Sequence, residues 1–269
     1  MSADRNHILP FADPAKHKTS AAIIQKLSSN PLDIRNVALD RISLAAVHNV
    51  LDLGCGFGFM SAKLVAATPP GTRLIGVDIF PENRTPFLTA CTVKDHPVEF
   101  ITRDIKNGLP WQNGCFDLIV CSYSLYFFVE SLAEIARVLH PDGWFIVITH
   151  SEHAFQGLYS AAGIAPKTSP LRSLLKKFSA ENGYRRLHSF FREIETIPYN
   201  NRLCFQSENL VDLLHYVQFK LPLLVENIHR IDRIPRPVKQ KLTLSLQHNQ
   251  TVIIDKTDAV FRCRSPRCH

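Results

Sequence analysis

The chain has 269 residues, which is long enough for one α/β domain with additions and short for two full domains. Its 45% hydrophobic and 20% charged residues are ordinary for a globular protein, and no run approaches 18 apolar residues, so we expect no membrane insertion. The net charge of +7 permits a nucleic-acid partner, although the basic residues are spread out and no aromatic-interleaved RNA-binding signature accompanies them.

Two further features concern the compartment of the protein. The first residues lack the charged-then-apolar order of a secretory signal, and a cytoplasmic location is the default expectation. Seven scattered cysteines, none in a C-x-x-C pair, indicate buried thiols in a reducing environment. Cys263, Cys268 and His269 crowd the C-terminus, but only their composition suggests a metal there, and we predict no metal site.

The first half of the chain alternates between predicted helices and strands. Residues 1–19 are polar and are expected to form a loose arm, and Asn30 followed by Pro31 predicts the start of a helix. In chain order, we predict helices over 21–27 and 32–47, a strand over 49–53, a helix over 59–67, a strand over 73–78, a helix over 81–91, strands over 98–101 and 116–121, a helix over 129–139 and a strand over 144–149. Apolar strands that alternate with helices indicate a parallel sheet covered on both faces.

The second half is less regular. Residues 151–168 are predicted to form a loop or lid, and Gly183 fits the left-handed end of a helix over 170–182. Beyond it we predict a strand over 189–197, a helix over 208–217 capped by Ser207, a stretch interrupted by prolines, a helix over 238–246 and a terminal strand over 251–262.

A glycine-rich turn follows the first strand. Gly54, Gly56 and Gly58 let the backbone take tight conformations and approach a ligand with no Cβ in the way. Asp52 precedes the turn. Asp78 ends the next strand about 20 residues beyond the last glycine, the distance at which an acid reaches ribose hydroxyls in a βαβ unit. The glycine spacing departs from the dinucleotide pattern G-x-G-x-x-G, which disfavours a nicotinamide oxidoreductase.

The run D-L-G-C-G-F-G at 52–58 resembles motif I of the class I, Rossmann-like methyltransferases that use S-adenosylmethionine (SAM). Residues 48–150 as a whole resemble the methyltransferase domain of the ubiquinone/menaquinone-biosynthesis-like enzymes. Further family motifs match in order at Asp78, at 103–105, at 116–125 and at 139–147, where Asp142 replaces a glycine. The resemblance implies an α/β fold with a doubly wound, seven-stranded, mostly parallel sheet and helical cap insertions.

The same resemblance implies a division of the chain. Residues 1–47 are expected to form an N-terminal helical cap segment, and residues 48–150 the SAM-binding core. Residues 151–269 are expected to add cap or lid helices together with the last two strands of the same sheet.

The resemblance also implies which residues hold the cofactor, SAM. Asp52 is expected to act on the methionine ammonium and Asp78 on the ribose hydroxyls. Asp104 and Ile105 are expected at the adenine, and the backbone around Ser122 beside the sulfonium. The predicted cofactor-binding residues are Asp52, Gly54, Cys55, Gly56, Gly58, Asp78, Ile79, Asp104, Ile105, Cys121 and Ser122. A turn carboxylate is the structural alternative for Asp104, and we favour a small loop filler over a reactive thiol for Cys55.

The acceptor is less well defined. Residues 121–124, C-S-Y-S, lack the N/D-P-P-Y/F/W pattern of enzymes that methylate base or glutamine amide nitrogens. Tyr123 is a candidate to line an acceptor pocket, with ordinary core packing as the alternative. His150 and His153 follow the fifth strand, where a general base would stand.

We therefore predict a methyltransferase that acts on a small-molecule acceptor by direct displacement, a reaction in which positioning supplies much of the rate. An RNA or protein methyltransferase stays open because of the basic charge. A non-catalytic SAM-binding regulatory protein stays open because no base is identified. The sequence predicts neither the acceptor nor the oligomeric state.

Overall fold

The computed structural model describes residues 8–92, 95–226, 233–249 and 251–267. The chain divides into two compact units, which we describe separately. The sheet unit comprises residues 32–150, 177–199 and 259–269, and the helical unit comprises residues 1–31, 151–176 and 200–258.

The sheet unit is built on a seven-stranded sheet with the strand order β3-β2-β1-β4-β5-β9-β6. Its strands are β1 (Asn49–Leu53), β2 (Arg73–Asp78), β3 (Val98–Thr102), β4 (Phe116–Ser122), β5 (Leu139–His150), β6 (Phe191–Tyr199) and β9 (Asp258–Pro266). The pairs of β1 with β2 and β4, of β2 with β3 and of β4 with β5 are parallel. This sheet confirms the predicted fold class, and the order reverses between β1 and β4, where ligands bind in such folds.

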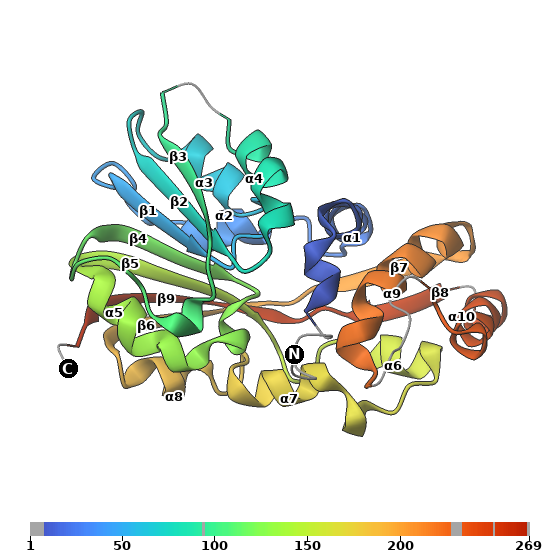
Figure 1. Ribbon diagram of the computed structural model, residues 1–269. Coiled ribbons are helices and arrows are strands. Elements are labelled where there is room, and N and C mark those ends of the chain that lie inside the picture. Colours follow the sequence, from blue (N-terminus) through green and yellow to red (C-terminus); the bar gives the residue numbers. More distant parts are fainter. Residues whose placement is uncertain (1–7, 93–94, 227–232, 250, 268–269) are drawn as a thin grey trace. The chain divides into compact units, whose positions relative to one another are not determined.

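Helices cover both faces of this sheet (Figure 1). On one face lie α2 (Ile34–Leu39), α3 (Ser61–Ala67) and α4 (Arg84–Ala90), and on the other lie α5 (Leu132–Val138) and α8 (Gly183–His188). The inner strands are buried on both faces, which explains their nearly continuous apolar sequence. Gly76 is required by packing, because a Cβ there would lie 2.3 Å from the ring of Phe87.

A buried arginine fastens α2 to the sheet. Arg262 on β9 is 4% exposed, and its guanidinium donates to the carbonyl oxygens of Val37 and Ala38 at the end of α2. The same guanidinium pairs with Glu195 on β6 at 3.0 Å. These contacts satisfy carbonyl groups that a helix end leaves without partners.

The helical unit contains its own small sheet. Its helices are α1 (Pro14–Leu27), α6 (Gln156–Ala162), α7 (Pro170–Lys177), α9 (Leu210–Leu224) and α10 (Arg236–Asn249), and α7 ends one residue beyond the unit. Strands β7 (Arg202–Gln206) and β8 (Thr251–Asp255) pair antiparallel. Short 3-10 turns complete the chain at Leu9–Ala12, Pro81–Asn83, Ile105–Asn107, Leu125–Phe127, Val129–Ser131, Pro166–Thr168 and Ser207–Asn209. No helix in the described ranges is both long and apolar enough to cross a membrane.

Several predictions for the first half were wrong in extent. The loose arm is helical from Pro14, because Asp13 caps α1 by accepting the backbone N–H of Lys16. The helix expected over 32–47 is only α2, which Asp33 caps in place of Asn30. The strand expected over 144–149 is β5, which begins at Leu139 and contains a bulge: Phe116 pairs with Leu139, whereas Leu118 pairs with Trp144.

The second half differs more. The expected loop over 151–168 contains α6, and α7 ends at Lys177. Gly183 begins α8 instead of ending a helix, and a Cβ there would lie 2.5 Å from the ring of Phe261. Helix α9 continues through Pro222 to Leu224, and the strand expected over 251–262 is two strands in different sheets.

Candidate cofactor and active site

The turn from β1 into α3 takes the tight conformations that its sequence predicts. The φ angles of Gly54, Gly56 and Gly58 are +73°, +51° and +89°, a region that side chains rarely adopt. The N–H groups of Gly54 and Cys55 donate to the carbonyl of Val77 at 2.8 and 3.1 Å, so the turn is tied to the end of β2.

Two of the three glycines are also required by close packing. A Cβ on Gly54 would lie 2.5 Å from Cβ of Ser124, whose hydroxyl donates to the carbonyl of Leu53 at 2.7 Å. A Cβ on Gly58 would lie 3.3 Å from Cβ of Ala90 on α4. The glycines thus bring the turn against the end of β4 and against α4.

The carboxylate of Asp78 is held in place at the end of β2. Oδ2 accepts the N–H of Gly56 at 2.8 Å, and Oδ1 accepts the N–H of Phe80 at 2.9 Å and the side-chain amide of Asn83 at 3.3 Å. Asp78 is buried, and burial raises the pKa of its carboxyl while these hydrogen bonds oppose the rise.

Asp52 is buried on β1, and its two carboxylate oxygens differ in their hydrogen bonds. Oδ2 accepts the hydroxyl of Ser61 at 2.5 Å, whereas Oδ1 is buried with no hydrogen-bond partner among the described residues. Burial raises the pKa of Asp52 to about 7, the Ser61 bond opposes the rise, and the charge of Asp78 adds to it. An unsatisfied buried carboxylate oxygen is costly by itself and suits a cationic or donor group of a ligand.

The predicted adenine-side residues lie at the end of β3, which pairs with β2. Asp104 accepts the backbone N–H of Lys106 at 3.0 Å and so begins the 3-10 turn Ile105–Asn107. Asp104 therefore has the role of a turn carboxylate, which is the structural alternative that the sequence left open. Ile105 is buried and Ile79 is half-buried.

The end of β4 brings together three candidate residues of the sheet unit. Ser122 Oγ is buried and has no hydrogen-bond partner in the described ranges. Tyr123 has a φ of +57°, a strained value for a residue other than glycine, and its ring stacks on His150 at 4.6 Å between centroids. Such strain concentrates at functional sites, and the roles of Tyr123 and His150 stay predictions.

The thiols of Cys55 and Cys121, next to these candidate residues in the sequence, are buried and weakly acidic. Burial raises the pKa of Cys55 and of Cys121 well above the usual range. A thiol with a raised pKa is a poor nucleophile, so the packing interpretation of Cys55 agrees with its environment.

His153 belongs to a different unit from the other two candidates. It is exposed, it belongs to the helical unit, and its backbone N–H donates to the hydroxyl of Ser151 at 3.0 Å. His150 is buried in the sheet unit. Proximity in sequence therefore does not put the two imidazoles in one unit.

Three contacting residues were missed from the sequence. Ser61 binds Asp52, Asn83 binds Asp78, and Ser124 packs against Gly54. Ser61 and Asn83 lie outside the family motifs, and Ser124 lies inside the motif at 116–125, where the sequence gave no sign of its contact with Gly54.

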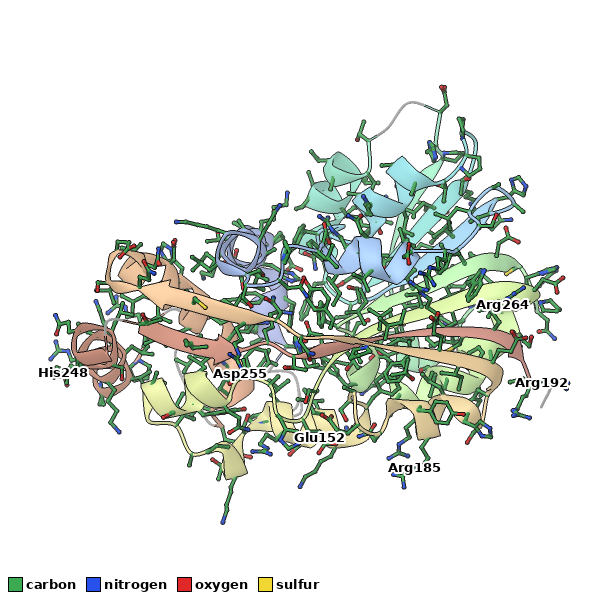
Figure 2. The ribbon with its side chains drawn as sticks, turned by 180° about the vertical axis from the view of Figure 1, so that it is seen from behind. Glu152, Arg185, Arg192, His248, Asp255 and Arg264 are labelled. Atoms are coloured by element: carbon green, nitrogen blue, oxygen red, sulfur yellow. The ribbon has the colours of Figure 1, made fainter. Side chains whose placement is uncertain are left out.

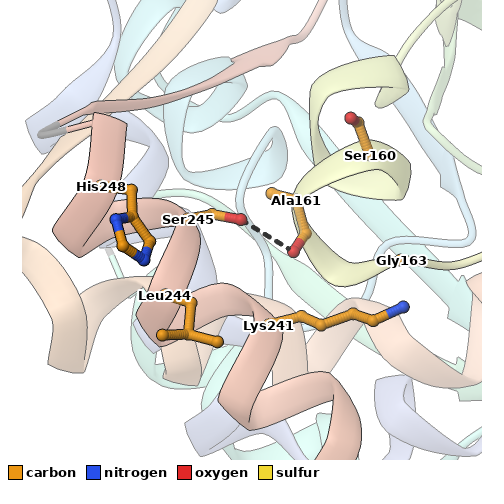
Figure 3. A pocket seen from close by; sticks show the side chains of 7 residues that line it. All are labelled: Ser160, Ala161, Gly163, Lys241, Leu244, Ser245 and His248. Atoms are coloured by element: carbon orange, nitrogen blue, oxygen red, sulfur yellow. Dashed lines mark hydrogen bonds between the residues drawn. The ribbon is translucent and has the colours of Figure 1, made fainter.

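A shallow hollow of about 380 Å³ lies between α6 and α10 of the helical unit (Figure 3). It is lined by Ser160, Ala161, Gly163, Lys241, Leu244, Ser245 and His248, and Ser245 Oγ donates to the carbonyl of Ala161 at 3.3 Å. Lys241, Leu244 and His248 are exposed, and none of the lining residues is a predicted site residue.

Metal and surface cations were also considered. No cluster of three or more histidine, cysteine or acidic side chains that would hold a metal occurs in the described ranges, and Cys268 and His269 lie outside them. Arg185 and Arg192 are exposed and extend away from the ribbon, whereas the guanidinium of Arg264 lies over the ring of Trp144 at 4.7 Å (Figure 2).

Part of this chain is similar in sequence to known methyltransferases. Residues 51–147 match the family model described as a methyltransferase domain. The uncharacterised methyltransferase YcgJ of Bacillus subtilis is 31% identical over 110 residues, or 39% of this chain and 42% of that protein. The demethylmenaquinone methyltransferase of Lactococcus lactis subsp. lactis is 31% identical over 119 residues, or 42% of this chain and 46% of that protein. The matches thus span less than half the length of these two relatives.

A solved structure from Bacillus halodurans, described as a candidate methyltransferase, shares the fold. It is 14% identical, its TM-score is 0.55, and the match covers 87% of this chain and 99% of that one. The seven-stranded sheet, the glycine turn with its two acids, and the matched family model agree. Residues 51–147 are therefore similar to a methyltransferase domain, and the seven-stranded sheet that contains them has the fold of that solved structure.

Proposed function

We propose that the whole protein transfers a methyl group from SAM to a small-molecule acceptor. The observation that carries the proposal is the unsatisfied Oδ1 of Asp52, which lies buried beside the fixed carboxylate of Asp78 and the glycine turn. A cofactor with a cationic end and ribose hydroxyls fits this pair of carboxylates.

Each residue then has a binding role. The Asp52 carboxylate accepts the methionine ammonium, and Asp78 accepts the ribose hydroxyls with the oxygen lone pairs that its present bonds leave over. Asp104 and Ile105 lie toward the adenine, and the backbone at Cys121 and Ser122 lies beside the sulfonium. When bound, the cofactor supplies a methyl group on a sulfonium sulfur. Because this sulfur leaves as a neutral thioether, the transfer needs no covalent help from the protein. The chain contributes alignment and exclusion of water.

The acceptor side rests on Tyr123 and His150. The stacked pair presents an aromatic face and an imidazole at the ends of β4 and β5. We propose that Tyr123 packs against the acceptor and that His150 holds or removes its proton, with His153 as the second candidate base. The Lactococcus lactis relative is named as a methyltransferase of a small molecule, demethylmenaquinone.

The cap role also remains a proposal. Residues 1–47 and the helices after residue 150 are proposed to cover the acceptor, while residues 48–150 bind the cofactor. The helical unit is compact, so such a cap would keep its shape.

The test is a methyl-transfer assay with labelled SAM against a panel of small acceptors, RNA and peptides. Label on a small acceptor supports the proposal. Label only on RNA, together with strongly salt-dependent RNA binding, would favour the nucleic-acid alternative. SAM binding with no transfer to any class would favour a regulatory protein.

A further inference from the structure

The helical unit contains a buried amine that the cofactor site does not use. Lys220 on α9 is 8% exposed. Its Nζ lies 5.3 Å from the ring centroid of Phe219, 5.7 Å from that of Phe155 and 6.0 Å from that of Tyr216. No residue in the described ranges accepts a hydrogen bond from this Nζ. Aromatic faces attract a cation but leave its three N–H donors unsatisfied.

A second donor on the same helix is also unsatisfied. Tyr216 precedes Lys220 by four residues and therefore shares its face of α9. The Tyr216 hydroxyl is buried and has no hydrogen-bond partner among the described residues. A phenol is normally paired when it is buried, so two donors in one aromatic environment share the same deficit.

The charges nearby leave a net positive site. Lys256 and Asp258 form a buried ion pair at 2.5 Å, and the two side chains are 5% and 0% exposed. Burial and the charge of Lys256 together lower the pKa of Lys220 to about 7, and the charge of Asp258 opposes this. Because Lys256 and Asp258 form an ion pair, protonation of Lys220 gives these three side chains a net positive charge.

The remaining wall is aromatic and neutral. His17 on α1 stacks on Phe219 at 5.0 Å between centroids, and Phe11 meets Phe219 edge-on at 5.4 Å. Burial lowers the pKa of His17 to about 3, so its imidazole carries no charge near neutral pH. Aromatic rings and two hydrogen-bond donors thus lie close together in the buried part of the helical unit.

We propose that Lys220 and Tyr216 bind the negatively charged oxygen of an organic anion whose unsaturated carbon frame packs against Phe155 and Phe219. A carboxylate or an ionised hydroxyl supplies hydrogen-bond acceptors for these donors and a charge opposite to that of protonated Lys220, which a water molecule cannot do. The hollow beside Lys241 offers no such site, because that lysine is exposed and the lining contains no buried unsatisfied donor among the described residues.

The test uses three small probes on the 269-residue chain without SAM. Benzoate represents a carboxylate, 4-nitrophenolate represents an ionised hydroxyl, and benzamide is the neutral control of the same shape as benzoate. We expect benzoate to bind at least about tenfold more tightly than benzamide in calorimetric titration. Lys220→Met should remove this difference, and Lys241→Met should keep it. Binding of 4-nitrophenolate alone would assign the site to ionised hydroxyls.

Equal affinity for benzoate and benzamide, or an anion preference that survives Lys220→Met, would overturn the proposal. The proposal would also be overturned if neither benzoate nor 4-nitrophenolate bound to the wild-type protein. If Lys220→Met does not fold, as judged by circular dichroism, Tyr216→Phe replaces it and should weaken anion binding by about 3- to 10-fold. SAM is titrated into the same samples. Anion binding without SAM binding refutes only the proposed function, and SAM binding without anion binding refutes only this inference.

Discussion

The backbone N–H of Gly56 donates to Oδ2 of Asp78 at 2.8 Å, and this bond joins the glycine turn after β1 to the end of β2. The Asp78 carboxylate is therefore fixed in orientation before a ligand arrives. Preorganised acceptors of this kind bind hydroxyl groups without the entropic cost of ordering a side chain.

Replacement of Asp78 by asparagine should weaken SAM binding by about 10- to 100-fold. The reason is that hydrogen bonds to a charged group contribute about 1.5–3 kcal/mol, and the amide keeps the shape but loses the charge. Calorimetric titration of the variant measures the effect. The matched control is Glu99→Gln, which removes an exposed carboxylate of neighbouring β3 that pairs with Arg73 at the surface. Equal loss in both variants would count against a specific role for Asp78.

Gly54 should tolerate no side chain. In Gly54→Ala the new Cβ overlaps Ser124, and the φ of +73° adds backbone strain, so we expect a loss of about 1–3 kcal/mol in the free energy of unfolding. The double variant Gly54→Ala/Ser124→Gly removes the overlapping atoms and should recover part of this loss. Urea denaturation of both variants measures the two values. No recovery in the double variant would show that the strain lies in the backbone alone.

The raised pKa of Asp52 predicts the direction of two pH effects. Its carboxyl has an ordinary value of 3.8, and its value in the folded protein is about 7. Between these values the folded state holds a proton that the unfolded state has lost, so the free energy of unfolding falls as pH rises from about 4 to about 7, by at most ~1.4 kcal/mol per pH unit. Asp52→Asn should flatten this slope.

SAM binding should change in the opposite direction over the same range. The ionised carboxylate pairs with the cofactor's ammonium, so affinity rises with pH up to about 7 and binding near neutral pH releases a proton. Titrations in buffers of different ionisation enthalpy measure that proton. Proton uptake instead of release would refute the assignment of the ammonium to Asp52.

His150 is predicted to act in the transfer step. His150→Phe keeps an aromatic ring against Tyr123 but removes the imidazole nitrogens, and it should lower kcat by about 10²-fold or more with little change in the Kd of SAM. The control is His140→Gln, an exposed histidine near the start of β5. A changed Kd of SAM with unchanged kcat would assign His150 to cofactor binding.

Sequence reasoning succeeded where one strand carries its own signal. The bounds of β1 and β2 match the prediction, because buried parallel strands are short apolar runs bounded by turn residues. It failed where distant segments decide the outcome. Gly183 resembles a helix end in sequence, but it begins α8 because the Phe261 ring leaves no room for a Cβ.

The candidate site divides in the same way. Asp52, the glycines and Asp78 follow from spacing along a single βαβ unit. Ser61, Asn83 and the Lys220 environment could not be predicted, because each depends on side chains that only the folded chain brings together.

The most direct measurement is calorimetric titration of the purified protein with SAM, with its demethylated product and with NADH. The proposed function predicts micromolar binding of the first two and no binding of NADH, with affinity for SAM lowered about 10- to 100-fold in Asp78→Asn and kept in Glu99→Gln. Absence of SAM binding, or NADH binding tighter than that of SAM, would contradict it.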